Sequence, residues 1–166
     1  MYFARSANQR GIKQTLKQHL ERVADLAAMF ADEFDSKLEG QIAGLYHDFG
    51  KYSISFQKVL EGSKQNVNHS VAGSAVVYIR YKPELMPVVY SIYAHHSNLD
   101  CCIEGVIKES LLADDTCYDS DGKELAIAGV EEYKKYLRIF DSEIVSPKES
   151  IKRVDFDYCL NKNIAA

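Results

Sequence analysis

Apolar residues recur every three or four positions over most of this 166-residue chain, and all five histidines lie on or at the ends of these periodic segments. Such spacing puts apolar side chains on one face and is typical of amphipathic helices packed on a core. No segment shows a convincing strand pattern. We therefore predict an all-α fold, a helical bundle in which histidines from separate helices approach one another.

The first predicted helix spans residues 12–35, and His19 lies at the edge of its apolar stripe. Because residues three and four apart share a helix face, we expect the His19 ring to point inward. A single inward histidine is as often a core residue, hydrogen-bonded to a carbonyl, as it is a ligand. The stripe comprises Ile12, Leu16, Leu20, Val23, Ala27, Phe30 and Phe34.

The second predicted helix begins at a capping box formed by Ser36 and Glu39 and ends at Gly50, which we expect to be left-handed. His47 and Asp48 fall in its last turn. A surface interpretation leaves Asp48 solvated, but a carboxylate is unfavourable at the negative end of a helix. Metal binding explains the pair better, because the two oxygens of Asp48 can bridge two ions while His47 binds one.

Asn68 is a good N-cap for a helix that begins at His69, and residues 72–75 give that helix a small-sided surface which another backbone can approach closely. A charged imidazole in the first turn would face the positive end of the helix dipole. We therefore expect His69 to be a neutral, ligating imidazole.

Pro87 fits the first turn of a further helix that ends at His95 and His96. Adjacent residues on a helix differ by about 100° in direction, so both rings reach one ion only where the helix unwinds. Ser97 and Asn98 permit such unwinding. Taken alone, the pair is as often a surface feature that compensates the helix dipole.

Three more helices are expected. A short one is capped by Ser53 and stopped by Gly62, a second covers residues 102–113, and a third carries apolar residues from 126 to 140. Ser146 begins a further cap signature.

Composition narrows the classes of protein further. An apolar share of 46% and a charged share of 27% are those of an ordinary globular protein, and no apolar run suffices to span a membrane. The four cysteines form no C-x-x-C pair, which favours reduced thiols and a cytoplasmic protein. The net charge of −4 argues against a broad basic surface for nucleic acid. No phosphate-binding loop, GxGxxG motif or serine elbow is present.

The order of these residues resembles the HD metal-dependent phosphohydrolase superfamily. Within it, three motifs are similar to the HD nuclease domain of the CRISPR-associated type I interference helicase-nuclease, over roughly residues 15 to 100. The motifs are His47-Asp48-Phe49-Gly50-Lys51, Asn68-His69-Ser70 and His95-His96-Ser97.

The resemblance implies a helical HD bundle with two metal sites between its helices. One metal would be held by His19, His47 and Asp48, while Lys51 would meet a phosphate oxygen and act with Asp48 in catalysis. The second metal would be held by Asp48, His69, His95 and His96.

In that family a late aspartate completes the first metal site, and it has no clear counterpart in this sequence. Asp114 is too early, while Asp155 and Asp157 lack the surrounding apolar pattern. We expect residues 1–166 to form a single HD nuclease-like domain, shortened or cut before that ligand. The superfamily-two helicase that usually follows would be supplied by a separate chain or subunit, or omitted.

The function implied by the resemblance is hydrolysis of single-stranded DNA in type I CRISPR interference, with the RNA-guided surveillance complex and a helicase as partners. The imidazole-rich ligand set favours manganese, nickel, cobalt or iron over magnesium. Two alternatives remain open. One is a nucleotide or phosphomonoester phosphohydrolase, and the other is a non-catalytic, metal-binding HD regulatory domain.

Overall fold

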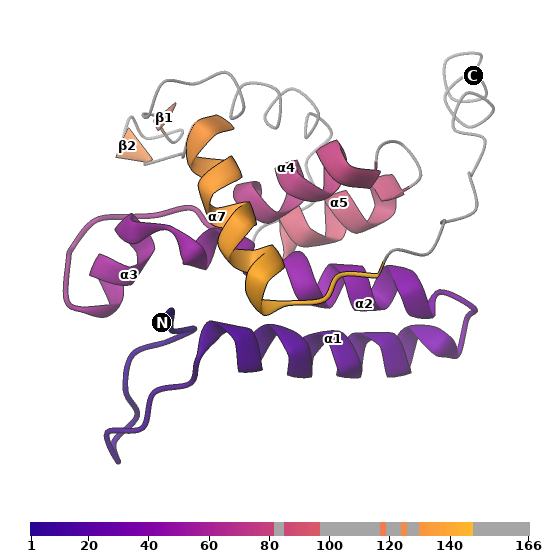
Figure 1. Cartoon of the computed structure of the whole chain (residues 1–166), viewed down its shortest axis with the longest axis horizontal. Coiled ribbons are helices and arrows are strands. Elements are labelled where there is room, and N and C mark those ends of the chain that lie inside the picture. Colours follow the sequence, from indigo (N-terminus) through magenta and orange to yellow (C-terminus); the bar gives the residue numbers. More distant parts are fainter. Residues whose placement is uncertain (82–84, 97–116, 119–123, 126–129, 148–166) are drawn as a thin grey trace.

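The computed structural model of the chain describes residues 1–81, 85–96, 117–118, 124–125 and 130–147, and it is built almost entirely of helices (Figure 1). The predicted all-α class is therefore confirmed. Among the described residues a two-residue antiparallel pair is the only sheet, with Cys117 opposite Leu125. The elements are α1 (Leu16–Asp32), α2 (Lys37–Tyr46), the 3₁₀ helix η1 (Phe49–Tyr52), α3 (Ile54–Leu60), α4 (Ser70–Tyr81), α5 (Met86–Ala94), β1 (Cys117–Tyr118), β2 (Glu124–Leu125) and α7 (Val130–Glu143).

Helices α1 and α2 form a hairpin whose two helices pack unusually closely (Figure 1). A Cβ atom added at Gly40 would lie 2.5 Å from the carbonyl oxygen of Ala27, and one at Gly44 would lie 2.6 Å from the backbone nitrogen of Ala24. Real Cβ atoms essentially never come this close to other atoms. The two glycines therefore let the backbones approach, and this fixes α1 against the helix that leads to His47.

This close contact corrects the predicted stripe of the first helix. Leu16 and Leu20 are buried as expected, but Phe30 and Phe34 are 65% and 69% exposed. The face of α1 toward α2 is made of small residues such as Ala24, because larger side chains do not fit between the backbones. Ile12 is 61% exposed and precedes the helix. The helix starts at Leu16, where the Thr15 hydroxyl caps it by accepting a hydrogen bond from the Gln18 N–H.

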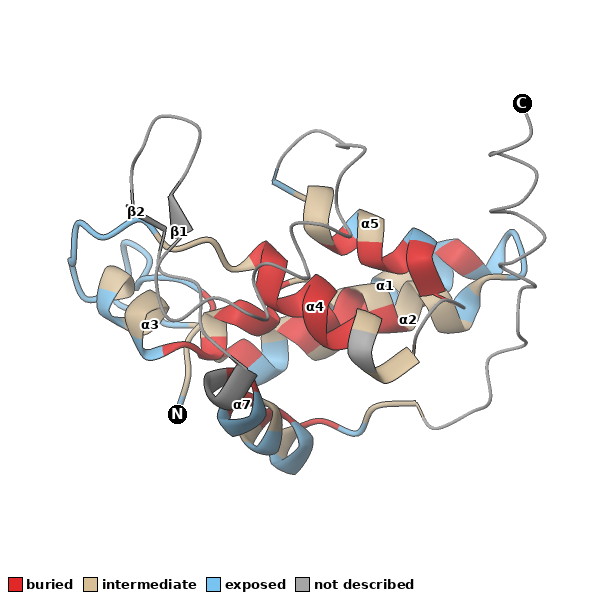
Figure 2. Cartoon of the chain, turned by 90° about the horizontal axis from the view of Figure 1, so that it is seen from above, coloured by how far each residue is buried: buried red, intermediate tan, exposed pale blue. Residues whose placement is uncertain are grey.

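The core beside the HD motif is aromatic, and helix α7 closes it. Phe140 of α7 is fully buried. Its ring centroid lies 4.8 Å from that of Tyr46, 5.5 Å from that of Phe49 and 6.0 Å from that of Tyr52. Figure 2 shows buried residues concentrated along α4 and α5, with exposed positions on the outer side of α7. Phe140 therefore packs against Tyr46 and Phe49, the residues directly before and after His47-Asp48.

Two predicted caps of the second helix differ in the structure. Ser36 makes no side-chain cap to α2, since its hydroxyl donates to the Phe34 carbonyl instead. Gly50 is not left-handed: it lies inside η1, and a glycine is needed there because a Cβ would strike the backbone of His69. Helix α2 ends at Tyr46, so His47 and Asp48 follow its last turn instead of lying in it: His47 is the C-cap of α2 and Asp48 is the N-cap of η1.

Other predicted helix ends agree with the structure, except one that differs by one residue. The Ser53 hydroxyl caps α3 by accepting from the Phe56 N–H, and Gly62 follows that helix with φ +106°. Pro87 lies in the first turn of α5. Asn68 accepts hydrogen bonds from the backbone N–H and hydroxyl of Ser70, so α4 starts one residue later than predicted.

Several predictions lie outside the described residues. They concern the helix over 102–113, the start of the helix over 126–140, Ser97 and Asn98, and the candidate aspartates Asp114, Asp155 and Asp157. Within the part of the chain that the structure describes, no helix has both the length and the apolar character needed to cross a bilayer.

Candidate metal centre

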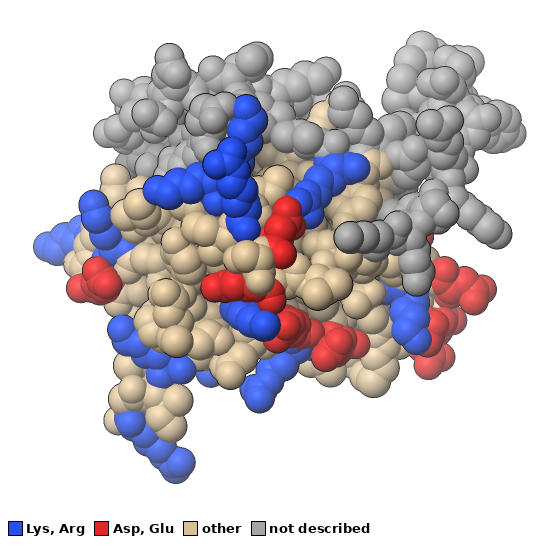
Figure 3. All heavy atoms as spheres, viewed as in Figure 1, with Lys and Arg blue, Asp and Glu red and all other residues tan. Residues whose placement is uncertain are grey.

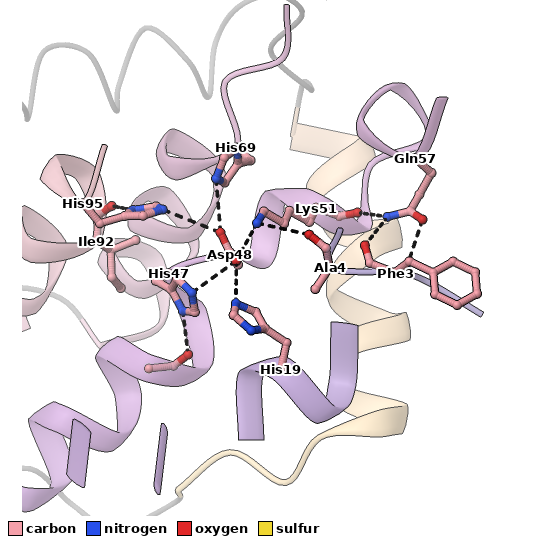
Figure 4. A network of polar contacts seen from close by, with 11 residues as sticks. Phe3, Ala4, His19, His47, Asp48, Lys51, Gln57, His69, Ile92 and His95 are labelled. Atoms are coloured by element: carbon pink, nitrogen blue, oxygen red, sulfur yellow. Dashed lines mark hydrogen bonds and ion pairs between the residues drawn. The ribbon is translucent and has the colours of Figure 1, made fainter. Parts of the chain in front are cut away.

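The carboxylate of Asp48 lies at the centre of four imidazoles and one ammonium group (Figure 4). It is 2% exposed. Its oxygen Oδ2 lies 2.9 Å from His19 Nε2, 3.2 Å from His47 Nε2 and 2.8 Å from Lys51 Nζ. Its other oxygen, Oδ1, lies 3.1 Å from His69 Nε2 and 3.6 Å from His95 Nε2. The two oxygens therefore face two different sets of histidines.

Each histidine reaches Asp48 from a different structural element. His19 lies in the first turn of α1, and His47 is the C-cap of α2. His69 directly precedes α4, and His95 is the C-cap of α5. The cluster therefore exists only in the folded chain, where four helix ends meet.

Two of the rings have their protonation fixed by a backbone carbonyl. His47 Nδ1 lies 2.8 Å from the Gly44 carbonyl oxygen, and His95 Nδ1 contacts the Ile92 carbonyl oxygen in the same way. A carbonyl only accepts, so Nδ1 carries the proton in both rings. Nε2 is then the nitrogen that faces Asp48, which is how metal-ligating histidines are usually held.

His96 lies in the turn that follows α5, next to the second set of imidazoles. Its ring centroid is 4.1 Å from that of His95 and 4.8 Å from that of His69. Burial, and then the neighbouring charges of His95 and His69, lower the pKa of His96 and favour its neutral form. A donor atom from each of Asp48, His69, His95 and His96 lies within 4.8 Å of the others, and the same is true of His19, His47 and Asp48.

The second set has the chemistry of a cation site. Asp48 Oδ1, His69 Nε2 and His95 Nε2 are all buried, and none of them has a hydrogen-bond partner among the described residues. Buried polar atoms without partners are costly, and here they face one another. Ligands bound about 2.1 Å from a metal lie about 3.0 to 3.4 Å apart, close to the 3.1 and 3.6 Å seen here. The residues present therefore fit a divalent metal.

Lys51 supplies a positive charge on the other side of the carboxylate. Its side chain is 14% exposed, and its ammonium lies 3.4 Å from the Ala4 carbonyl oxygen and 5.3 Å from the ring centroid of Phe56. Gln57 ties this region to the N-terminal segment, because its amide donates to the carbonyls of Lys51 and Phe3. The ammonium is therefore held in place beside Oδ2.

Asp48 is a charged carboxylate in spite of its burial. Burial alone would raise its pKa, but the interactions with His19, His47, His69 and His95 outweigh that effect and hold the pKa well below its usual range. A carboxylate must be deprotonated to bind a metal, so a charged Asp48 among imidazole nitrogens is suited to that role.

The late aspartate expected for the first site is not found among the described residues. Asp141 of α7 is paired with Arg80, and Glu143 accepts a hydrogen bond from the Tyr52 hydroxyl. Neither belongs to the two groups of potential metal ligands around Asp48. Asp114, Asp155 and Asp157 lie outside the described residues.

The comparison with protein families agrees with this arrangement. The family model described as the HD domain matches residues 16–141, which is most of the chain and includes all five histidines and Asp48. The chain belongs to the HD domain family. HD domains are typically metal-dependent hydrolases that bind divalent metals. No curated protein matches this chain.

The structure brings together all six predicted ligands of this HD domain and places Lys51 beside them. Their roles as metal ligands and in catalysis stay a prediction. Sequence reasoning did not identify the carbonyls of Gly44 and Ile92, which orient His47 and His95. The three-residue spacing could have indicated them, because a histidine at the end of a helix can reach the free carbonyl three residues before it.

Proposed function

We propose that this HD domain is a metal-dependent nuclease that hydrolyses phosphodiester bonds in single-stranded DNA, and that it does so in type I CRISPR interference. The observation that carries the proposal is one buried carboxylate shared by two sets of imidazoles, with an ammonium at its side. The choice of DNA and of the interference pathway rests on the similarity of the motifs at residues 47–51, 68–70 and 95–97.

Two divalent ions at such a site would activate the attacking water and neutralise charge that develops on the scissile phosphate. The residues of this chain would fix the spacing of the two sites, because both share the carboxylate of Asp48. Five imidazoles and one carboxylate favour manganese, iron, cobalt or nickel over magnesium, which prefers oxygen ligands. His95 and His96 give the second set more nitrogen donors than a site for free nucleotides commonly uses.

Lys51 is proposed to contact a phosphate oxygen of the substrate. Its ammonium is already held beside Asp48 by the Ala4 carbonyl and the Phe56 ring, so little conformational entropy would be lost on binding. A lysine acts on phosphate as a point charge and needs no fixed bidentate geometry.

The surface supports delivery of the strand by partners. Over the described part of the face in Figure 3, basic and acidic side chains lie close together, and the whole chain carries a net charge of −4. Such a surface has no large field to attract DNA on its own. A superfamily-two helicase and the RNA-guided surveillance complex are the proposed partners that bring the single strand to the metals.

The test compares two substrates under identical metal loading. Purified protein is supplied with Mn²⁺, Ni²⁺ or Co²⁺ and offered circular single-stranded DNA or a mixture of dNTPs. We expect the DNA to be cut and the dNTPs to remain. Asp48→Ala should abolish cleavage, whereas the matched variant Asp32→Ala should cleave normally, because Asp32 is exposed on α1 and pairs with Lys37.

Other results would favour other functions. Consumption of dNTPs with the DNA spared would make this domain a nucleotide phosphohydrolase. Metal binding with no turnover of either substrate would make it a regulatory domain. Cleavage of DNA that survives Asp48→Ala would exclude the bridging carboxylate from the reaction.

A further inference from the structure

Two glycines lie where the loop that carries Asp48 meets helix α4. A Cβ atom at Gly50 would lie 2.7 Å from the Cα of His69, and one at Gly73 would overlap the carbonyl oxygen of Tyr46. The first contact runs from η1 to His69, the residue before α4, and the second runs from α4 back to the end of α2. The two elements are therefore in backbone contact at both points.

The contact at Gly50 sets the distance between Asp48 and His69. Gly50 lies two residues after Asp48 and touches the backbone of His69 itself. The Nε2 atom of His69 is only 3.1 Å from Asp48 Oδ1. Any side chain at residue 50 would have to push the His69 backbone away, and the imidazole would move with it.

The contact at Gly73 involves two histidines of the second set, His69 and His95. Gly73 follows His69 by four residues and so lies about one helical turn further along the chain. A Cβ there would also come within 3.1 Å of Ile92 Cγ2. Ile92 is the residue whose carbonyl orients His95. A methyl group at Gly73 would therefore displace α4 from α2 and press on the residue that holds His95.

We propose that Gly50 and Gly73 are positioning residues for the second metal site, which is formed by Asp48, His69, His95 and His96. They contact no metal or substrate, and they act by letting α4 and α5 come close enough for one ion to reach all four donors. The inference rests on the proposed metal-centred function. We expect a smaller effect on the first set, because His19 and His47 both belong to the closely packed α1–α2 hairpin.

The test isolates the second site in a His19→Ala background, which should bind a single Co²⁺. Gly73→Ala or Gly50→Ala is then added, and Co²⁺ is titrated while its visible absorption is recorded. We expect the dissociation constant to rise at least about tenfold, as for loss of a group that orients a metal ligand.

The matched control is Gly40→Ala in the same background. A Cβ at Gly40 meets the Ala27 carbonyl oxygen and, at 2.6 Å, the Ala31 Cβ, so it makes a similar clash. Gly40 precedes His47 by seven residues on α2, or about 10 Å along the helix. It should lower the melting temperature but leave Co²⁺ affinity within about twofold. Circular dichroism shows whether each variant is folded. If Gly73→Ala is unfolded, the Co²⁺ affinity of Gly50→Ala tests the proposal.

Unchanged Co²⁺ affinity in a folded Gly73→Ala or Gly50→Ala variant would overturn the proposal. An equal loss in Gly40→Ala would overturn it as well, because general loosening of the bundle would then suffice. The titration needs no turnover, so its outcome is separate from the nuclease proposal. That proposal fails if the wild-type protein with both metals leaves single-stranded DNA uncut.

Discussion

The two oxygens of Asp48 differ in the partners that the fold gives them. Oδ2 forms a 2.9 Å hydrogen bond with His19 and a 2.8 Å ion pair with Lys51, so the chain satisfies this oxygen by itself. Oδ1 lies among His69 and His95 without a hydrogen-bond partner among the described residues. We therefore expect the Oδ1 side to be the stronger of the two proposed metal sites, because a cation there would remove an existing cost.

The elements behind the two oxygens also differ. On the Oδ2 side, His19 and His47 come from one helix hairpin, and the side chain of His19 is 26% exposed. On the Oδ1 side, His69 is 14% exposed and His95 is 19% exposed. His47 is 18% exposed and His96 is an exposed residue, so burial does not separate the two sides. They differ in their elements, because the histidines near Oδ1 come from the ends of two separate helices, α4 and α5.

The largest difference between the two sides is expected from His69→Ala. Removing this ligand leaves Oδ1 facing His95 alone, so the stronger metal should be lost. We expect DNA cleavage to fall roughly 10³-fold, the upper range for loss of one electrostatic contact in a catalytic site. Steady-state cleavage of single-stranded DNA measures the loss. Retention of more than about a tenth of the activity would place the essential metal on the other side.

His19→Ala should have a smaller effect, because Lys51 still balances Oδ2. Cleavage is expected to fall roughly 10²-fold, and one metal should remain bound. Elemental analysis of the purified variant gives the metal content, and the same cleavage assay gives the rate. If His19→Ala proves more damaging than His69→Ala, the ranking of the two sites is reversed.

Metal removal should follow the same order. A chelator added in steps is expected to take the metal at His19 and His47 first and the one at His69 and His95 last, because the first site has fewer donors. The last metal should stabilise the fold by about 2.7 kcal/mol at a concentration one hundred times its dissociation constant. Thermal unfolding at each chelator concentration records both steps. A single concerted step would contradict two unequal sites.

The smallest effect is expected from Lys51→Met. Methionine keeps most of the volume of the side chain but removes the ion pair with Asp48 and the charge proposed to meet phosphate. Cleavage should fall by about tenfold, chiefly through a higher KM. The metal content should stay at the wild-type value, and elemental analysis checks this. A variant that loses metal would show instead that Lys51 supports a ligand.

Much of this site could be predicted from the sequence, because histidines at helix ends are a local pattern. The periodicity placed His19 on the first helix and Pro87 in the first turn of α5, and the structure agrees. The orientations of Phe30 and Phe34 could not be predicted this way, because they depend on how closely α1 approaches α2. Local sequence gives a helix face, whereas a neighbouring backbone decides which part of it is buried.

Gly50 shows the same limit within the HD motif. Its position near the end of a helix predicts a left-handed cap. In the structure Gly50 lies in η1 instead, and because it has no Cβ, the backbone of His69, which is distant in sequence, can contact it. The carbonyl partners of His47 and His95 likewise depend on where each helix ends. The late aspartate was not located by the sequence, and it is not found among the described residues.

If Asp48 belongs to two metal sites at once, its removal should empty both, so the most direct test is the number of metals held by Asp48→Ala. The protein is loaded with Co²⁺, desalted and analysed for cobalt, with circular dichroism to confirm folding and Asp32→Ala as the control. We expect two equivalents in the control and none in Asp48→Ala. Two retained equivalents in a folded Asp48→Ala variant would contradict this expectation, because the shared carboxylate would then hold neither metal.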